Sequence, residues 1–266
     1  MLACPGQSVG VVCIDGWGYL ACRFVALVVP RACPLFVLMV RDKVCGMTPL
    51  TTPSDVLLIF DLDGTLYRTE SSFVSTMKAA YANHGIPYVG DAAVLGMVGE
   101  TFPTFLEWLA EQGFPNDADA LSRDISKYEV ESIAEDGELY PGVEETLRTL
   151  KQRGFLLAIC TNGDMQYVSA VLGKFDLLDL FDDIKTHGDF EQTKTEMIAE
   201  LLERYRPEHA FMIGDRYHDF VAGNANDCIV VATTYGFASD GEADEVDFRL
   251  DRFSDLPAIV KPFVAA

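Results

Sequence analysis

The sequence of 266 residues predicts an α/β fold in which a parallel sheet carries helices on both faces and an all-helical segment is inserted. From residue 143 onward, short apolar runs alternate with amphipathic helical segments, as in successive strand–helix–strand crossovers. An earlier apolar run at 56–60 is separated from that part by roughly seventy residues with helical periodicity alone. Together these observations predict a Rossmann-like core and a helical cap domain.

The first strand is expected at 56–60, an apolar run too short for a helix and rich enough in branched side chains to be buried on both faces. Asp61 and Asp63 follow it. Because alternate residues of an extended chain point the same way, both carboxylates would face one small volume, and Gly64 lets the backbone turn closely around it. A plain acidic turn after a buried strand is the alternative.

Two adjacent carboxylates repel one another unless a cation or a shared proton relieves them, and a magnesium ion would do so. In such a site one carboxylate can attack phosphorus and become an aspartyl phosphate. The other can handle the protons of the leaving and attacking oxygens. Asp61 and Asp63 therefore indicate phosphoryl transfer.

The inserted segment, residues 67–139, is expected to form the helical cap. Helical periodicity is found at 73–81, 104–111 and 119–134. Polar, glycine and proline residues at 67–69 and 135–142 suit a two-stranded hinge. The loop 96–101 either closes over the catalytic carboxylates as a lid or only connects helices.

The remainder of the core is expected to comprise 47–66 and 140–266. The expected helices are 143–153, 165–172, 195–205 and 219–225, and the expected strands are 155–160, 183–186, 210–213 and 228–232. The tail from residue 243 is expected to be an edge strand or an irregular wrap.

Ligands of parallel sheets gather at the carboxyl ends of the strands, so the residues after each strand are candidates for binding. Thr161, Asn162 and Gly163 follow the second strand. They offer a hydroxyl, an amide and free N–H groups at a helix start, which suit a phosphate. Capping of that helix is the alternative role of the same residues.

Charged residues follow the third and fourth strands. Lys194 stands at a helix start, where its charge could neutralise the nucleophile and the phosphate, and Lys185 in the preceding strand is the competing candidate. Asp215 supplies a carboxylate opposite Asp61 for an oxygen-liking cation, and Asp219 can hold the loop of Asp215 or Lys194. Because these ligands are oxygens without grouped His or Cys, magnesium fits better than zinc.

In this order the motifs resemble the haloacid dehalogenase (HAD) superfamily of phosphohydrolases, in particular its phosphoglycolate phosphatase-like branch with a helical C1-type cap. The resemblance covers residues 56–237. It implies Asp61 as the nucleophile and Asp63 as the general acid and base. It also implies that Thr161 and Lys194 stabilise the phosphate.

The same resemblance implies a magnesium ion held by Asp61, Asp215 and the backbone carbonyl of Asp63, with Asp219 behind these ligands. Residues expected at the substrate phosphate are Gly64, Thr65, Asn162 and Gly163.

Two positions depart from the family pattern. Thr195 stands where a proline is common, and Arg216 stands where a serine or threonine is frequent. Arg216 is expected to touch the substrate or to cap a helix, and His187 and His218 to lie at the surface or behind the ligands.

The expected function is a magnesium-dependent phosphatase of small phosphomonoesters, phosphoglycolate-like or sugar phosphates, acting through an aspartyl phosphate. A phosphomutase of the beta-phosphoglucomutase type is one alternative. It would need a histidine and lysine set in the cap, where the sequence offers His84, Lys78 and Lys127. A non-catalytic binding protein that keeps the HAD fold is the other alternative.

The formal charge of −21, from 41 acidic and 20 basic residues, argues against nucleic acid or an anionic membrane as partner. The expected partner is a small phosphorylated metabolite, and the protein is expected to be a monomer or homodimer. Cys160 and Cys228 fall in apolar runs and are expected to be reduced core residues, which indicates the cytoplasm.

Residues 1–46 differ from the rest, because they hold five of the seven cysteines and show no clear periodicity. Their apolar stretch 24–40 contains Pro30, Arg31 and Pro34, which make it a poor membrane helix. Met47 begins an ordinary short lead into the first strand. We therefore expect a native start at Met47 and a non-native or disordered extension before it.

Overall fold

The computed structural model describes residues 52–115, 117–187, 192–238, 241–242 and 246–264. The expectation for residues 1–46, including a start at Met47, lies outside this part of the chain. Among the described residues, the helices do not combine the length and the hydrophobicity that a membrane-spanning segment needs.

The described residues form a six-stranded parallel sheet with the order β3-β2-β1-β4-β5-β6. The strands are β1 (Val56–Phe60), β2 (Leu156–Thr161), β3 (Asp183–Thr186), β4 (His209–Gly214), β5 (Ile229–Thr233) and β6 (Phe248–Leu250). Phe60, the last residue of β1, is paired with Ile159 of β2 and with Ile213 of β4. This register places Asp61 beside the C-terminal ends of both neighbouring strands.

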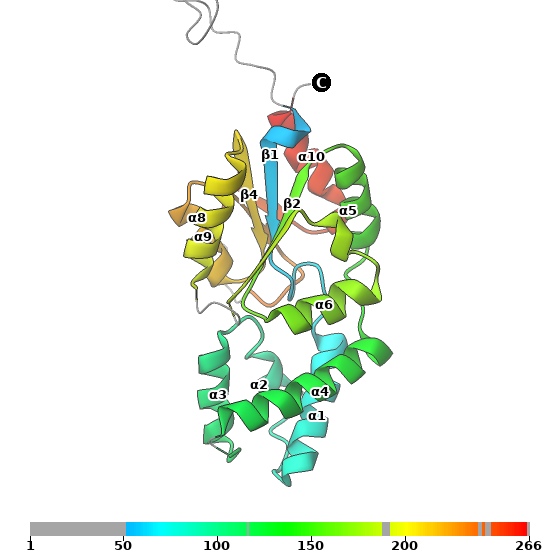
Figure 1. Ribbon diagram of the computed structural model, residues 1–266, viewed down its shortest axis with the longest axis vertical. Helices are drawn as coiled ribbons and strands as arrows, with labels where there is room; N and C mark the ends of the chain where they lie inside the picture. The colour runs from blue at the N-terminus through cyan, green and yellow to red at the C-terminus, as the bar shows by residue number, and fades with distance from the viewer. Residues whose placement is uncertain (1–51, 116, 188–191, 239–240, 243–245, 265–266) are drawn as a thin grey trace, which may run out of the picture. The chain divides into compact units, whose positions relative to one another are not determined.

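Helices cover both faces of the sheet (Figure 1). On one face lie α5 (Val143–Gln152), α6 (Met165–Lys174) and α10 (Leu256–Val260), and on the other lie α8 (Lys194–Tyr205) and α9 (Tyr217–Ala225). Every side chain of β1 is buried. Val56, Leu58 and Phe60 lie in the apolar cluster on the face covered by α5, α6 and α10, and Leu57 and Ile59 lie in the cluster on the face covered by α8 and α9. Burial on two faces explains why this strand is continuously apolar.

The insert between β1 and α5 is helical, as expected. It contains α1 (Glu70–His84), α2 (Asp91–Leu95), α3 (Phe102–Glu111) and α4 (Ala118–Asp136). These helices share an apolar core in which Tyr81, Leu109 and Ile125 are buried. Tyr67 and Leu139 form a β-bridge where the chain enters and leaves the insert. The cap boundaries at 67–139 stay a prediction.

Two regions contain helices that the sequence did not predict. Five-residue α2 is too short to show a helical period. The tail forms the expected edge strand β6, but it also forms α10, which places Leu256 and Val260 in the core. Single helical turns occur at Pro53–Asp55, Leu178–Leu180, Phe253–Asp255 and Lys261–Phe263. Cys160 and Cys228 are free and buried, as expected.

Candidate active site

Five of the polar residues identified in the sequence meet at the C-terminal edge of the sheet. Asp61 directly follows β1, Thr161 ends β2 and Asp215 directly follows β4. Lys194 begins α8, and Asp219 lies in the first turn of α9. All five are buried, so each charge depends on its immediate neighbours rather than on water.

Lys194 connects two of these carboxylates. Its Nζ donates to Asp61 Oδ1 at 2.8 Å and to Asp219 Oδ1 at 2.6 Å. Burial alone would lower the pKa of Lys194, but the charges of Asp219 and Asp61 raise it well above its ordinary value. A reciprocal capping box between Thr193 and Glu196 fixes the start of α8. The local sequence therefore sets the position from which the ammonium group reaches Asp61.

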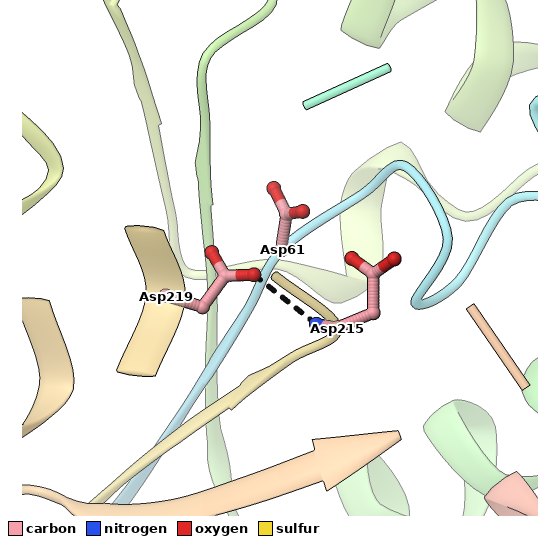
Figure 2. A group of neighbouring side chains, drawn as sticks. All are labelled: Asp61, Asp215 and Asp219. Atoms are coloured by element: carbon pink, nitrogen blue, oxygen red, sulfur yellow. Dashed lines mark hydrogen bonds between the residues drawn. The ribbon is translucent and has the colours of Figure 1, made fainter. Parts of the chain in front are cut away.

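Asp219 holds the loop after β4, as Figure 2 shows. Its Oδ2 accepts hydrogen bonds from the backbone N–H of Asp215 at 3.1 Å and of Arg216 at 3.0 Å. A Cβ atom on Gly214 would lie 2.3 Å from this carboxylate, so the close approach requires glycine there. Because Lys194 occupies the other oxygen, Asp219 acts by positioning Asp215 and Lys194.

Asp61 and Asp215 are the carboxylates best placed to hold a cation. Together with Asp219 they offer oxygen atoms that all lie within 4.8 Å of one another. Asp215 Oδ2 accepts from the backbone N–H of Phe237 at 2.6 Å, whereas its buried Oδ1 has no hydrogen-bond partner among the described residues. A buried carboxylate oxygen without a donor is costly unless a cation serves it.

The electrostatics of this cluster also favour an added cation. Burial and the charge of Asp219 raise the pKa of Asp61 to about 7, against the opposing effect of Lys194. Burial, Asp61 and Asp219 likewise raise the pKa of Asp215 well above its usual value. The site thus carries more negative charge than Lys194 neutralises. Hard oxygen ligands with this charge suit Mg²⁺, so the residues present fit a magnesium site.

Asp63 is held by side chains from the hinge segment and from α6. Its Oδ1 accepts hydrogen bonds from Thr69 Oγ1 at 2.6 Å and from Tyr167 Oη at 2.5 Å. Burial raises the pKa of Asp63, and these two donors oppose that rise. Thr69 and Tyr167 are site residues that were not predicted from the sequence. Thr69 lies in the predicted hinge segment, six residues after Asp63, so its position near Asp63 could have been predicted. No motif in the sequence indicates Tyr167.

The residues after β2 form a tight turn. Thr161 Oγ1 accepts from the backbone N–H of Gly163 at 3.1 Å, and Asn162 Nδ2 donates to the carbonyl of Gly99 at 2.9 Å. Asp164 accepts from the N–H of Tyr167 and thereby caps α6. The alternative that Thr161 or Asn162 caps this helix is therefore wrong, because the cap residue is Asp164. Thr161 and Asn162 line the cavity instead, and their binding of phosphate stays a prediction.

A cavity of about 210 Å³ opens at this edge of the sheet. From the core it is lined by Asp61, Asp63, Thr161, Asn162, Gly163, Asp164, Tyr167 and Lys194. Asp215, Gly64 and Thr65 do not line it. Instead, Gly64 makes room for Asp215, because a Cβ atom there would lie 2.1 Å from Asp215 Oδ2. Thr65 is buried, with its hydroxyl unpaired among the described residues.

The loop 96–101 of the insert closes over this edge. Arg216 Nη1 donates to the carbonyl of Val98 at 2.6 Å, and Arg216 Nη2 lies 3.5 Å from Glu100 Oε1. The hydrogen bond from Asn162 to Gly99 is a second contact. Both donors come from loops that carry catalytic candidates. These contacts favour the lid over the plain connector, and Arg216 serves as the anchor of that lid.

Other charged residues considered from the sequence lie outside the cluster. Lys185 Nζ is 2.5 Å from Glu200 Oε2, at the edge of the sheet, and does not line the cavity. His218 Nε2 is 3.6 Å from Glu100 Oε2, behind the lid. Of the two lysines considered, Lys185 in the third strand and Lys194 after it, Lys194 is therefore the one that reaches Asp61.

Known proteins are similar to this chain over both the core and the insert. The chain matches the family described as haloacid dehalogenase-like hydrolase over residues 58–233. It is 31% identical to the phosphoglycolate phosphatase of Pasteurella multocida (strain Pm70) over 219 residues, which cover 77% of this chain and 98% of that protein. It is also 31% identical to the pyrophosphatase PpaX of Bacillus cereus (strain B4264) over 219 residues, which cover 76% of this chain and 95% of that protein.

A solved structure has the same fold. The crystal structure of a predicted phosphoglycolate phosphatase from Haemophilus somnus 129pt matches with a TM-score of 0.70 at 24% sequence identity. The match covers 81% of this chain and 100% of that one. The sheet, its helices and the insert are therefore shared with that protein.

Proposed function

The chain belongs to the haloacid dehalogenase-like hydrolases, and on that premise we propose that it is a magnesium-dependent phosphatase of small phosphomonoesters. The family and the enzymatic role inferred from the motifs are confirmed by the match over residues 58–233. One observation supports the proposal most. Asp61, Asp215 and Asp219 converge, and Lys194 pairs with Asp61 and Asp219, which leaves a negative charge that a divalent cation would balance.

The substrate class rests on the relatives together with the site. Their names refer to phosphoglycolate and to pyrophosphate, which are both small phosphorylated molecules. The cavity beside Asp61 holds about 210 Å³, which suits a compact leaving group. We infer a small phosphorylated metabolite as substrate. Cytoplasmic location and the oligomeric state stay predictions.

In the first step, a carboxylate oxygen of Asp61 attacks phosphorus while the bond to the leaving oxygen breaks. Asp63 gives its proton to that oxygen, so the product leaves as an alcohol. Lys194 lies 2.8 Å from Asp61 and stays charged, so its ammonium group offsets negative charge on the nucleophile and the transferring group. Thr161 lines the cavity beside Asp61, and although its Oγ1 accepts from the N–H of Gly163, its own hydroxyl hydrogen can be donated to a phosphate oxygen.

In the second step, water attacks the phosphorus of the aspartyl phosphate. Asp63, now ionised, takes the proton of that water, and the bond between phosphorus and Asp61 breaks to release inorganic phosphate. A Mg²⁺ ion held by Asp61, Asp215 and the carbonyl of Asp63 would supply charge neutralisation in both steps. The lid anchored by Arg216 keeps bulk water away from the cavity.

The phosphomutase alternative loses support from the placement of the basic residues in the insert. Lys78 lies 3.1 Å from Asp91, His84 lies 3.2 Å from Asp124, and Lys127 is exposed. None of these three basic residues lines the cavity. A sugar phosphate held for a second transfer would need such groups at the distal phosphate.

Phosphate release from p-nitrophenyl phosphate tests the proposal. We expect turnover that requires Mg²⁺, stops with a chelator and is abolished in Asp61→Asn. Asp179→Asn, which changes an exposed carboxyl far from the cluster, is the matched control and should behave as the wild type. Turnover by Asp61→Asn at the wild-type rate would falsify the mechanism.

A further inference from the structure

The insert supplies the wall of the cavity opposite Asp61. The apolar part of this wall comes from α1, α3 and α4, with Phe73, Phe105 and Ile125 as its main side chains. The wall also contains a carboxyl group, that of Glu129. Because the phosphoryl group must lie against Asp61, this wall faces the leaving group of the substrate.

The polar side chains of this wall form a stripe on α4. Ser122, Ser126 and Glu129 are spaced by four and three residues, so they share one face of the helix. All three line the cavity. The buried face of an amphipathic helix is normally apolar, and packing alone does not require a hydroxyl or a carboxyl here. The stripe is suited to accept hydrogen bonds from a ligand.

No basic residue of the described chain forms an ion pair with Glu129. Lys194, which is the basic residue among the described residues that line the cavity, is bound to Asp61 and Asp219. Arg216 is bound to Val98 and lies near Glu100. Glu129 is therefore a carboxyl group on the cavity wall that no basic side chain of the described residues pairs with.

The other charges near Glu129 are negative. Burial, followed by the charges of Asp63 and Asp164, raises its pKa to about 8. A carboxylate on the leaving group would add another negative charge to this wall, with no basic side chain to neutralise it. A hydroxyl or an amine would instead donate a hydrogen bond to Glu129, and an amine would also balance its charge.

We propose that the substrate is a phosphomonoester of a small alcohol that ends in a hydrogen-bond donor, either a hydroxyl or an amine, and that Glu129 disfavours esters that end in a carboxylate. This inference rests on the phosphatase activity proposed above. The inference narrows the substrates to phosphomonoesters whose leaving group is neutral or cationic. The apolar wall contacts their carbon chain, and the α4 stripe receives their polar end.

Three probes with a two-carbon chain separate the possibilities: 2-hydroxyethyl phosphate, 2-aminoethyl phosphate and 2-phosphoglycolate. At about pH 9, where Glu129 with its pKa of about 8 is mostly ionised, we expect kcat/KM with Mg²⁺ to be at least about tenfold higher for the hydroxyl or the amine probe than for the carboxylate probe. Whichever of the first two probes has the higher kcat/KM shows whether the substrate ends in a hydroxyl or in an amine. A value for 2-phosphoglycolate that equals or exceeds both others contradicts the inference, as does turnover of p-nitrophenyl phosphate with none of the three hydrolysed.

Glu129→Gln tests whether this residue makes the distinction. At about pH 9, where a carboxyl group with a pKa of about 8 is mostly ionised, we expect the ratio of kcat/KM for 2-phosphoglycolate to that for 2-aminoethyl phosphate to rise about tenfold, because the amide removes the negative charge. Glu131→Gln on the exposed side of α4 removes the same charge outside the cavity and should leave the ratio unchanged. An unchanged ratio in Glu129→Gln assigns no such role to Glu129 and overturns the inference.

The comparison of probes in the wild type does not depend on whether a variant folds. Its failure also differs from failure of the proposed function. If the wild type with Mg²⁺ releases no phosphate from p-nitrophenyl phosphate, the phosphatase proposal is wrong. If it does so but prefers the carboxylate probe, only the inference about the leaving group is wrong.

Discussion

Lys194 Nζ lies 2.8 Å from Asp61 Oδ1, although the two residues are 133 positions apart in the chain. Both side chains are buried. The bond joins the start of α8 to the end of β1, so it contributes to the stability of the core as well as to the charge balance of the site. The cation cannot be removed without leaving two carboxylates, Asp61 and Asp219, unpaired.

Replacement of Lys194 by methionine should therefore reduce both stability and activity. Breaking a buried ion pair costs about 3–5 kcal/mol, and loss of charge stabilisation in the transition state lowers kcat by roughly a hundred- to a thousandfold. Urea unfolding and steady-state kinetics with p-nitrophenyl phosphate measure the two effects.

Lys185→Met is the matched control, because Lys185 is the other lysine considered from the sequence and pairs with the exposed Glu200. We expect a loss of about 1 kcal/mol or less and wild-type kcat. Equal effects of the two substitutions would show that the contact between Lys194 and Asp61 has no special role.

Gly64→Ala should weaken metal binding. Gly64 has a φ of 70°, and an added Cβ would lie 2.1 Å from Asp215 Oδ2. Displacing Asp215 is expected to raise the Mg²⁺ concentration for half-maximal activity by roughly ten- to a hundredfold. A titration of activity with Mg²⁺ measures this shift.

Gly85→Ala separates the clash from the backbone strain. Gly85 has a φ of 65°, but nothing lies within 4 Å of its added Cβ. Both variants should lose about 1–2 kcal/mol of stability from the left-handed conformation, whereas only Gly64→Ala should change the Mg²⁺ dependence. A similar shift in both would mean that strain, and not the contact with Asp215, explains the effect.

Much of the core and its catalytic edge could be predicted from the sequence. The run 56–60 is apolar because β1 is buried on both faces, so the strand and the position of Asp61 after it were visible directly. Parallel strands end at one edge, which is why the sequence alone predicts that Thr161 and Asp215 lie beside Asp61.

The residues supplied by the insert could not be predicted in the same way. Glu129 lies on a helix whose rotation relative to the cavity depends on packing against α1 and α6, and a helical period alone does not fix it. The hydroxyl of Tyr167 donates to the carboxylate of Asp63, and the guanidinium group of Arg216 donates to the backbone carbonyl of Val98. Contacts of this kind leave no spacing pattern in the sequence.

Glu129 should make stability depend on pH. Its pKa is raised from 4.5 to about 8 in the folded chain, so the folded state binds more protons than the unfolded state between these values. Stability therefore falls as pH rises, by up to about 1.4 kcal/mol per pH unit from this residue. In Glu129→Gln this slope is lost, so the variant should become more stable than the wild type toward pH 8. Urea unfolding without Mg²⁺ across this range measures the difference.

Glu131→Gln, in the same helix but exposed, gives the reference for that measurement. Subtracting its pH profile from that of Glu129→Gln removes the general effect of losing an acidic side chain from α4. If the stability difference between Glu129→Gln and the wild type does not change with pH, the carboxyl of Glu129 ionises in the folded chain as it does in the unfolded chain.

Arg216→Lys should loosen the lid while it preserves the charge. A lysine cannot reproduce the hydrogen bond from the guanidinium group to the carbonyl of Val98, and a charge-assisted bond contributes about 1.5–3 kcal/mol. We expect faster amide hydrogen exchange at 97–101 and a higher KM for p-nitrophenyl phosphate. Arg252→Lys, at an exposed pair with Asp255, should change neither. If the amide hydrogen exchange rates at 97–101 are unchanged in Arg216→Lys, Arg216 does not anchor the lid.

Asp63→Asn should separate the two chemical steps, because p-nitrophenolate leaves without needing a proton whereas the attacking water needs a base. Release of p-nitrophenol should begin with a burst equal to the enzyme concentration, followed by a steady rate lower by roughly a hundred- to ten-thousandfold. Rapid-mixing absorbance measures the burst, and mass spectrometry after acid quench should find the phosphoryl group on Asp61. Tyr167→Phe keeps the carboxylate of Asp63 but removes one of its donors, so it should show no burst and a smaller loss. A burst in Tyr167→Phe would show instead that Tyr167 controls the attack of water on the aspartyl phosphate.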